Sequence, residues 1–281
     1  TAGQQTVSLT LTSNHGCSNS ITKTVEIKNS PVADFTWSTA CEGLPVRFTN
    51  TTQTWLSTLS DYFWTFNQQV NFTQTHPQYT FPTAGNYVVQ LVAIQRVNQC
   101  RDTILKTVTV APNPTALPFP ASGCATETIA LHHASIPGIG YSLNQVEWNV
   151  APVAGIISGN HLISNNTAGT FPIEITVTNN AGCSASAQST VQIFEKPDAH
   201  IVIPNDTLYL PVNFIVSSLN NNAEYLYRWY RNGTLTSTDS SWRFIQNMAQ
   251  IDTLALEMRT PHGCFDSDRM VITTLVPEID L

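Results

Sequence analysis

Charged side chains are scarce in this chain of 281 residues, at 11% against about 25% in an average globular protein. The 12 Lys and Arg residues are scattered, and 19 acidic residues leave a net charge of −7. A nucleic-acid-binding surface needs clustered basic side chains. The composition therefore excludes nucleic acid as a partner.

Long apolar runs and catalytic motifs are also missing. The longest apolar stretches have only a few residues, far short of the roughly 20 that a membrane-spanning helix needs, so the chain is predicted not to be transmembrane. There is no Gly-x-Ser-x-Gly, no His-Glu-x-x-His and no Cys-His pair at a recognisable spacing. We therefore predict no catalytic residue, no metal ligand and no cofactor, and we expect a protein that is not an enzyme.

Two series of cysteines recur at nearly the same step. The first series consists of Cys17, Cys100, Cys183 and Cys264, whose successive positions differ by 83, 83 and 81. The second consists of Cys41 and Cys124, whose positions again differ by 83. Moving residues 1–27 forward by 166, twice 83, lays them on residues 167–193 with 13 of 27 positions identical. The chain is therefore a tandem array with a period of about 83 residues.

Each repeat carries signatures of β-strands. A tryptophan recurs at one phase of the repeat, as Trp64, Trp148 and Trp229, within segments that alternate in polarity. Ahead of the first-series cysteines, apolar residues alternate with Thr, Ser, Gln or Glu, as at Val89 and Leu91. Strict alternation is typical of strands that are buried on one face. Because the abundant Thr and Asn are also weak helix formers, we predict an all-β fold.

Prolines mark the joints between repeats. Short linkers that contain proline are stiff and stop strand pairing across them, so they favour a semi-rigid rod of domains. The expected segments are 1–29, 30–112, 113–196 and 197–281. Residues 1–29 hold only the last two strands of a unit, and a lone hairpin is marginally stable in water. We therefore expect this first segment to be the end of a truncated unit of a longer chain.

Three segments resemble the PKD (polycystic kidney disease type) domain family. Tyr79–Leu91 is similar to the family's tyr-x-phe, x-x-x-gly-x-tyr-x-val-x-leu sequence, and Pro31–Phe35 and Val46–Asn50 also resemble it. The family's trp-x-phe-gly-asp-gly is replaced here by Trp64–Gln69, without the turn glycines or the aspartate. The resemblance implies tandem immunoglobulin-like (PKD-type) antiparallel β-sandwiches, with 197–281 as a divergent immunoglobulin-like domain.

Cysteine-punctuated arrays of PKD-like units resemble those of large secreted cell-surface proteins of Bacteroidota. Such proteins leave the cell through the type IX secretion system and include adhesins and gliding filaments. The resemblance implies an extracellular, cell-surface stalk or filament, whose partners are neighbouring repeats of the same long chain and candidate surface glycans or proteins. Two alternatives stay open: a carbohydrate- or protein-binding module, and an accessory region of a secreted hydrolase.

The implied sandwich fold leaves two disulfide patterns open. Bonds inside each unit would join Cys41 to Cys100 and Cys124 to Cys183, and Cys264 would then have no partner. The first-strand corner and the last-hairpin corner lie at opposite ends of an immunoglobulin-like sandwich, however, and a disulfide needs Cα atoms within about 7 Å. Bonds between neighbouring units would join Cys41 to Cys183 and Cys124 to Cys264, which uses every cysteine of the last two units. Either pattern implies an oxidising compartment.

Three tryptophans fall outside the phase of the expected core tryptophans: Trp37, Trp55 and Trp242. Exposed aromatic rings can stack on sugars or anchor a protein partner, so these three are candidate binding residues. Packing at domain joints is the alternative role.

Three Asp-Thr-aliphatic sequences resemble the acceptor of O-linked glycosylation in Bacteroidota. They would place glycans on Thr103, Thr207 and Thr253.

Overall fold

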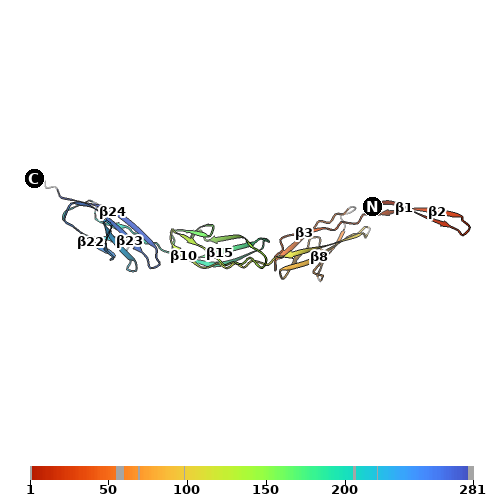
Figure 1. Ribbon diagram of the computed structural model, residues 1–281, viewed down its shortest axis with the longest axis horizontal. Coiled ribbons are helices and arrows are strands. Elements are labelled where there is room, and N and C mark those ends of the chain that lie inside the picture. The colour runs from red at the N-terminus through yellow and green to blue at the C-terminus, as the bar shows by residue number, and fades with distance from the viewer. Residues whose placement is uncertain are drawn as a thin grey trace. The chain divides into compact units, whose positions relative to one another are not determined.

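The computed structural model describes residues 2–54, 60–68, 70–97, 99–204, 207–219 and 221–277. These residues form 24 β-strands and no helix (Figure 1). Within them, accordingly, no helix is long and apolar enough to cross a membrane. The strands pair into several β-sandwiches, so the predicted all-β sandwich fold is confirmed.

The first two strands form an isolated hairpin. β1 (Gly3–Thr12) and β2 (Ser18–Ile27) pair antiparallel, with Gly3 opposite Ile27 and Thr12 opposite Ser18. Alternation puts apolar residues on one face and Ser and Thr on the other, where Thr10 and Ser20 share a hydrogen bond of 2.7 Å between their hydroxyl oxygens. All residues of both strands are exposed.

The next strands form two sheets around an aromatic core. One sheet has the order β3-β4-β7, with β3 (Phe35–Trp37), β4 (Pro45–Asn50) and β7 (Gln78–Thr80). The other has the order β6-β5-β8-β9, with β5 (Ser60–Phe66), β6 (Val70–Phe72), β8 (Gly85–Gln95) and β9 (Arg101–Val110). Trp64 is fully buried, packs edge-on against Phe35 at 5.1 Å between ring centroids, and donates its indole N–H to the Gln74 carbonyl.

The third group of strands again makes two sheets. One has the order β10-β16-β15-β12, with β10 (Ala121–Cys124), β12 (Leu143–Val150), β15 (Gly169–Asn179) and β16 (Ser184–Phe194). The other has the order β11-β14-β13, with β11 (Thr128–Ala130), β13 (Gly155–Ser158) and β14 (His161–Ser164). β10, the first strand of this group, pairs in parallel with β16, the last one. Trp148 is buried, as its phase predicts.

The last group has the sheets β17-β19-β22 and β18-β24-β23-β20-β21. The first consists of β17 (Ile201–Val202), β19 (Val212–Ser218) and β22 (Ser241–Gln246). The second consists of β18 (Thr207–Tyr209), β20 (Leu226–Arg231), β21 (Thr234–Ser237), β23 (Gln250–Arg259) and β24 (Phe265–Leu275). Trp229 is fully buried and donates its indole N–H to the Asp239 carbonyl, 10 residues further on, as Trp64 does in its own unit.

By its contacts the chain divides into two compact units. The first consists of Thr1–Thr115, Ile136–Gln145 and Val177–Ala185, and the second of Ala116–Ser135, Val146–Thr176 and Ser186–Leu281. One end of the third group of strands therefore belongs to the first unit. The segment boundaries at 30, 113 and 197 stay a prediction.

Candidate functional site

The four long hairpins end in turns that a first-series cysteine closes. In three of them the first residue of the turn, Ser13, Asn179 or Thr260, donates its backbone N–H to the cysteine carbonyl at 2.8–2.9 Å. Its side-chain oxygen accepts the cysteine N–H at 3.1–3.2 Å. The glycine before the cysteine has φ between 81° and 89° in all three turns, a conformation that glycine adopts without strain. The repeat thus preserves a turn geometry that presents a cysteine at the hairpin tip.

The turn between β8 and β9 is one residue longer and closes differently. Gln95 donates its N–H to the Cys100 carbonyl, and Gln99 donates back to the Gln95 carbonyl, both at 2.9 Å. Gln99 takes the left-handed conformation, with φ 58°, at the position where the other turns have glycine. The cysteine still lies at the hairpin tip.

Cys41 and Cys183 form a disulfide between the loop that precedes β4 and the β15–β16 turn. Their Cα atoms are 5.7 Å apart, and both residues are buried, together with Ala111. Tyr141 and Ala181 pack against this cluster. The bond therefore lies in a small apolar core of its own, shielded from solvent reductants.

Polar side chains complete the surroundings of this disulfide. Asn179 is fully buried and donates its amide Nδ2 to the carbonyls of Pro112 and Pro137 at 3.0 and 3.1 Å. Glu42, next to Cys41, accepts the Asn113 N–H at 3.1 Å, and its carbonyl accepts from the Asn113 amide at 2.9 Å. These bonds attach the 112–113 linker to both cysteine-bearing segments.

Cys124 and Cys264 form the second disulfide, with Cα atoms 5.6 Å apart. It joins the end of β10 to the β23–β24 turn, and both residues are buried. Ser164 donates its hydroxyl to the Cys124 carbonyl at 2.9 Å. Phe194 stacks on His262, with ring centroids 3.9 Å apart. The second disulfide thus repeats the first one: a loop cysteine joined to the turn cysteine 140 residues later.

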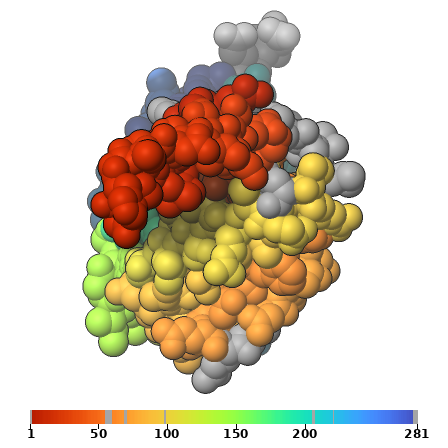
Figure 2. All heavy atoms as spheres, turned by 90° about the vertical axis from the view of Figure 1, so that its right-hand side faces the viewer, coloured from red at the N-terminus to blue at the C-terminus, as the bar shows by residue number. Residues whose placement is uncertain are grey.

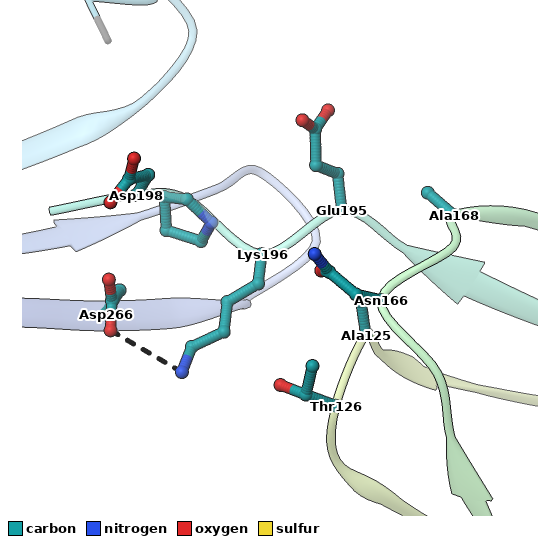
Figure 3. Close-up of a pocket in the computed structure, with 9 residues that line it drawn as sticks. Ala125, Thr126, Asn166, Ala168, Glu195, Lys196, Asp198 and Asp266 are labelled. Atoms are coloured by element: carbon teal, nitrogen blue, oxygen red, sulfur yellow. Dashed lines mark ion pairs between the residues drawn. The ribbon is translucent and has the colours of Figure 1, made fainter. Parts of the chain in front are cut away.

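A polar cavity of about 670 Å³ lies in the second compact unit, where Ala125, next to Cys124, lines it (Figure 3). Lys196 pairs with Asp266 across it at 3.4 Å, while Glu195 and Asn166 line its wall. The other carboxylate oxygen of Asp266 accepts the Ala199 N–H at 3.0 Å. These groups stiffen the 195–199 linker, and the described wall has no aromatic ring on which a sugar could stack.

Of the two disulfide patterns that the sequence left open, the structure has the one between neighbouring repeats, Cys41–Cys183 and Cys124–Cys264. The alternative bonds within units, Cys41 to Cys100 and Cys124 to Cys183, are not formed. The physical reason is that the loop cysteine and the turn cysteine of one sandwich lie at the two ends of its strands. Cys17 is in no disulfide within the part of the chain that the structure describes.

A family comparison identifies the segment that contains β3 to β9. Residues 28–110 match the PKD domain family. In this matched segment, Asn67 and Gln68 take φ values of 49° and 60°, so the turn after Trp64 has a left-handed conformation without glycines. A comparison with curated proteins finds no match for the chain.

Solved structures resemble the chain at low identity. The fibronectin(III)-like modules of Clostridium thermocellum CbhA are 15% identical with a TM-score of 0.38, covering 59% of this chain and 94% of that one. Three N-terminal domains of the bacteriophage RB49 outer capsid protein Hoc are 12% identical with a TM-score of 0.36, covering 89% and 99%. Bacteroides ovatus SGBP-B, solved with a mixed-linkage heptasaccharide, is 12% identical with a TM-score of 0.25, covering 89% and 71%.

The three candidate binding tryptophans have different surroundings. Trp37, on β3 beside the aromatic core of residues 28–110, is 36% exposed, with its ring centroid 6.0 Å from that of Phe35. Trp242 is half-buried and packs against the core of the last sandwich, edge-on to Phe244 with 5.6 Å between ring centroids, so its role as a binding residue stays a prediction. Trp55 lies outside the described residues. Trp37 belongs to the first compact unit and Trp242 to the second.

The three candidate glycosylation threonines lie on strands. Thr103 and Thr207 are exposed, and Thr253 is half-buried. The aspartates before two of them have structural partners: Asp102 accepts the Ala33 N–H at 2.8 Å, and Asp252 belongs to a buried ion pair. Asp102 and Asp252 therefore have structural roles of their own, and the three threonines stay predicted acceptors, of which Thr103 and Thr207 are exposed.

Sequence reasoning missed the buried ion pair of the last sandwich. Asp252 is fully buried and accepts two hydrogen bonds from Arg231, at 2.9 and 2.7 Å. Burial alone would raise the pKa of Asp252, but hydrogen bonds from Arg231, Gln250 and Asn232 outweigh it and hold that pKa below the usual aspartate value. The alternation along β23 could have revealed it, because Asp252 lies two residues before the buried Leu254 and therefore on the same face of the strand.

Proposed function

We propose that this chain is a non-enzymatic structural repeat region, a stalk or filament, of a large secreted cell-surface adhesin. The observation that carries the proposal is the pair of buried disulfides, each of which joins a loop to a hairpin turn 142 or 140 residues further along the chain. Bonds of this kind fasten successive sandwiches to one another. Under tension they limit how far the chain can extend.

The proposed location is extracellular. Stable disulfides form and persist in oxidising compartments, and a PKD domain joined to further sandwiches is consistent with a surface protein. Secretion through the type IX system and a role in gliding motility are part of the proposal, and they are supported only by the resemblance to cysteine-punctuated arrays of Bacteroidota.

Replacement of the segment within the natural protein tests the stalk role. Residues 30–281 are exchanged for an unrelated array with the same number of sandwiches, and adhesion and surface labelling by antibody are measured on intact cells. A stalk keeps both, because only spacing matters. Loss of adhesion with unchanged surface labelling would contradict the proposal and assign recognition to this segment.

The second candidate is a carbohydrate- or protein-binding module, which the exposed ring of Trp37 favours. Trp37→Ala in the natural protein separates the two functions. A binding module loses adhesion in this variant, whereas a stalk retains it. The accessory role in a secreted hydrolase would instead appear as lower turnover of an insoluble substrate after the exchange of residues 30–281.

A further inference from the structure

The β1–β2 hairpin carries an apolar face that nothing covers among the described residues. Register places six apolar side chains on this one face, and each is 46–68% exposed; they are Val7, Leu9, Leu11, Ile21, Val25 and Ile27. Figure 2 shows part of the hairpin's surface, in red, open to the viewer. Burial of apolar surface drives association, and a contiguous exposed apolar face marks a docking surface.

Equivalent faces elsewhere in the chain are fully covered. The same forward shift by 166 that relates the repeats lays Val7, Leu9 and Leu11 on Ile173, Ile175 and Val177. Those three residues of β15 are 0–1% exposed. They belong to a sandwich whose second sheet consists of β11, β13 and β14, all of which precede that hairpin in sequence. The occupant that fits the open face is therefore a set of strands equivalent to residues 113–166.

The tip of the hairpin provides an independent observation. The turn from Ser13 to Cys17 has the same hydrogen bonds and the same left-handed glycine as the turn that ends at Cys183. Cys183 is buried in a disulfide, whereas Cys17 is exposed and forms none in the described chain. A Cβ on Gly182 would lie 3.5 Å from Thr39 of the approaching loop, whereas one on Gly16 meets nothing within 4 Å. The turn is thus formed, and its partner loop is missing.

The partner loop does not come from a second copy of these residues. The two loop cysteines, Cys41 and Cys124, are both bonded already. The cysteine that fits Cys17 therefore lies outside the 281 residues, in a loop equivalent to the one around Cys41.

We propose that the β1–β2 hairpin is a docking face within a longer polypeptide. Preceding strands of the same polypeptide cover its apolar face, and Cys17 forms a disulfide with a loop cysteine of the unit before those strands. The two thiols lose two protons and two electrons to a disulfide oxidant, which is reduced to two thiols. This inference deepens the proposed stalk function, because it extends the fastening of successive sandwiches beyond these residues.

A tandem chain tests the proposal with the protein's own sequence. Residues 30–166 are placed ahead of Thr1 of the full chain, with the extra copy of Cys100 changed to Ser. The added Cys41 then precedes Cys17 by the same 142 residues that separate Cys41 from Cys183. The protein is oxidised with glutathione disulfide, free thiols are alkylated, and unreduced peptides are mapped by mass spectrometry.

We expect the Cys17 peptide to be linked to the added Cys41 in the tandem chain and alkylated in the original chain. The bonds Cys41–Cys183 and Cys124–Cys264 in the same sample report folding. Leu9→Asp on the apolar face should lower the Cys17 linkage at least tenfold, whereas Thr10→Asp on the opposite face should leave it unchanged. Equal alkylation of Cys17 in both chains would overturn the proposal, as would linkage of Cys17 to a second Cys17.

The natural protein provides a second measurement that does not depend on refolding. Its unreduced peptide map should link Cys17 to a cysteine outside the present sequence, and recovery of Cys17 as an alkylated thiol would overturn the proposal. Exchange of residues 30–281, which tests the stalk function, leaves the hairpin and Cys17 in place. Failure of one proposal is therefore distinguishable from failure of the other.

Discussion

Opening the two disulfides should lengthen the unfolded chain in a strongly non-additive way, because the bonds interlock. With both closed, the shortest covalent path from Cys41 to Cys264 crosses to Cys183, returns along about 59 residues to Cys124 and crosses to Cys264. Without either, the path follows the whole stretch of about 223 residues from Cys41 to Cys264. The bonds thus remove most of the chain from the path that carries tension.

Residue counts give the expected lengths. At roughly 3.3–3.6 Å per extended residue, the shorter path spans about 200 Å and the longer one about 770 Å. Cys41→Ser leaves a path of about 83 residues from Cys41 to Cys124, and Cys264→Ser leaves about 81 residues from Cys183 to Cys264. Each single change therefore adds only about 80 Å, whereas the double change adds about 570 Å.

Force spectroscopy of the full chain, held by tags at its two ends, measures these lengths. The contour length after complete unfolding is compared between the oxidised chain, each serine variant, the double variant and the chain in reductant. Bonds within units would leave about 105 residues in the path of the oxidised chain, namely the stretches from Cys100 to Cys124 and from Cys183 to Cys264. An oxidised length near about 360 Å for this part, with Cys41→Ser adding about 200 Å, would refute the reasoning.

Further predictions concern the interior of single sandwiches. Asp252→Asn should lower the free energy of unfolding at pH 7 by about 2–3 kcal/mol, since its arginine partner loses a buried counter-charge. Because the pKa of Asp252 is lowered on folding, wild-type stability should fall as the pH drops below about 4, and urea titrations of the variant should lack that dependence. Asn179→Ala should lower the free energy of unfolding by about 2–3 kcal/mol, because it leaves buried carbonyl and N–H groups without hydrogen bonds. The exposed Asn180→Ala is the control, and an equal loss of stability in both variants, measured by thermal unfolding, would contradict this prediction. Gly155→Ala should lower the free energy of unfolding by about 1–3 kcal/mol more than Gly159→Ala does. Both glycines have a positive φ, but only a Cβ on Gly155 would overlap a carbonyl oxygen of β14. Equal melting temperatures of the two variants would refute this prediction.

Local patterning was sufficient for the strands and for their buried faces. The alternation around Val89 and Leu91 and the phase of Trp64 predict buried positions, because side chains on a strand alternate between the two faces of a sheet. The same reasoning would have placed Asp252 on a buried face, but only the fold shows that Arg231 reaches it. The half-buried state of Trp242 was not predictable from the sequence, because it depends on which side chains of the last sandwich lie beside it.

The sequence by itself determined the repeat of about 83 residues, the all-β class and the two series of cysteines, since each of these depends on spacing along the chain. Only the tertiary structure decided that Cys41 joins Cys183 and that Cys124 joins Cys264, because a disulfide depends on which strand ends meet in space. It also showed that the turn at Cys17 is formed although the described residues include no disulfide partner for Cys17, beside an apolar face that is covered in the equivalent hairpins. Spacing identifies equivalent positions, and packing decides which of them are in contact.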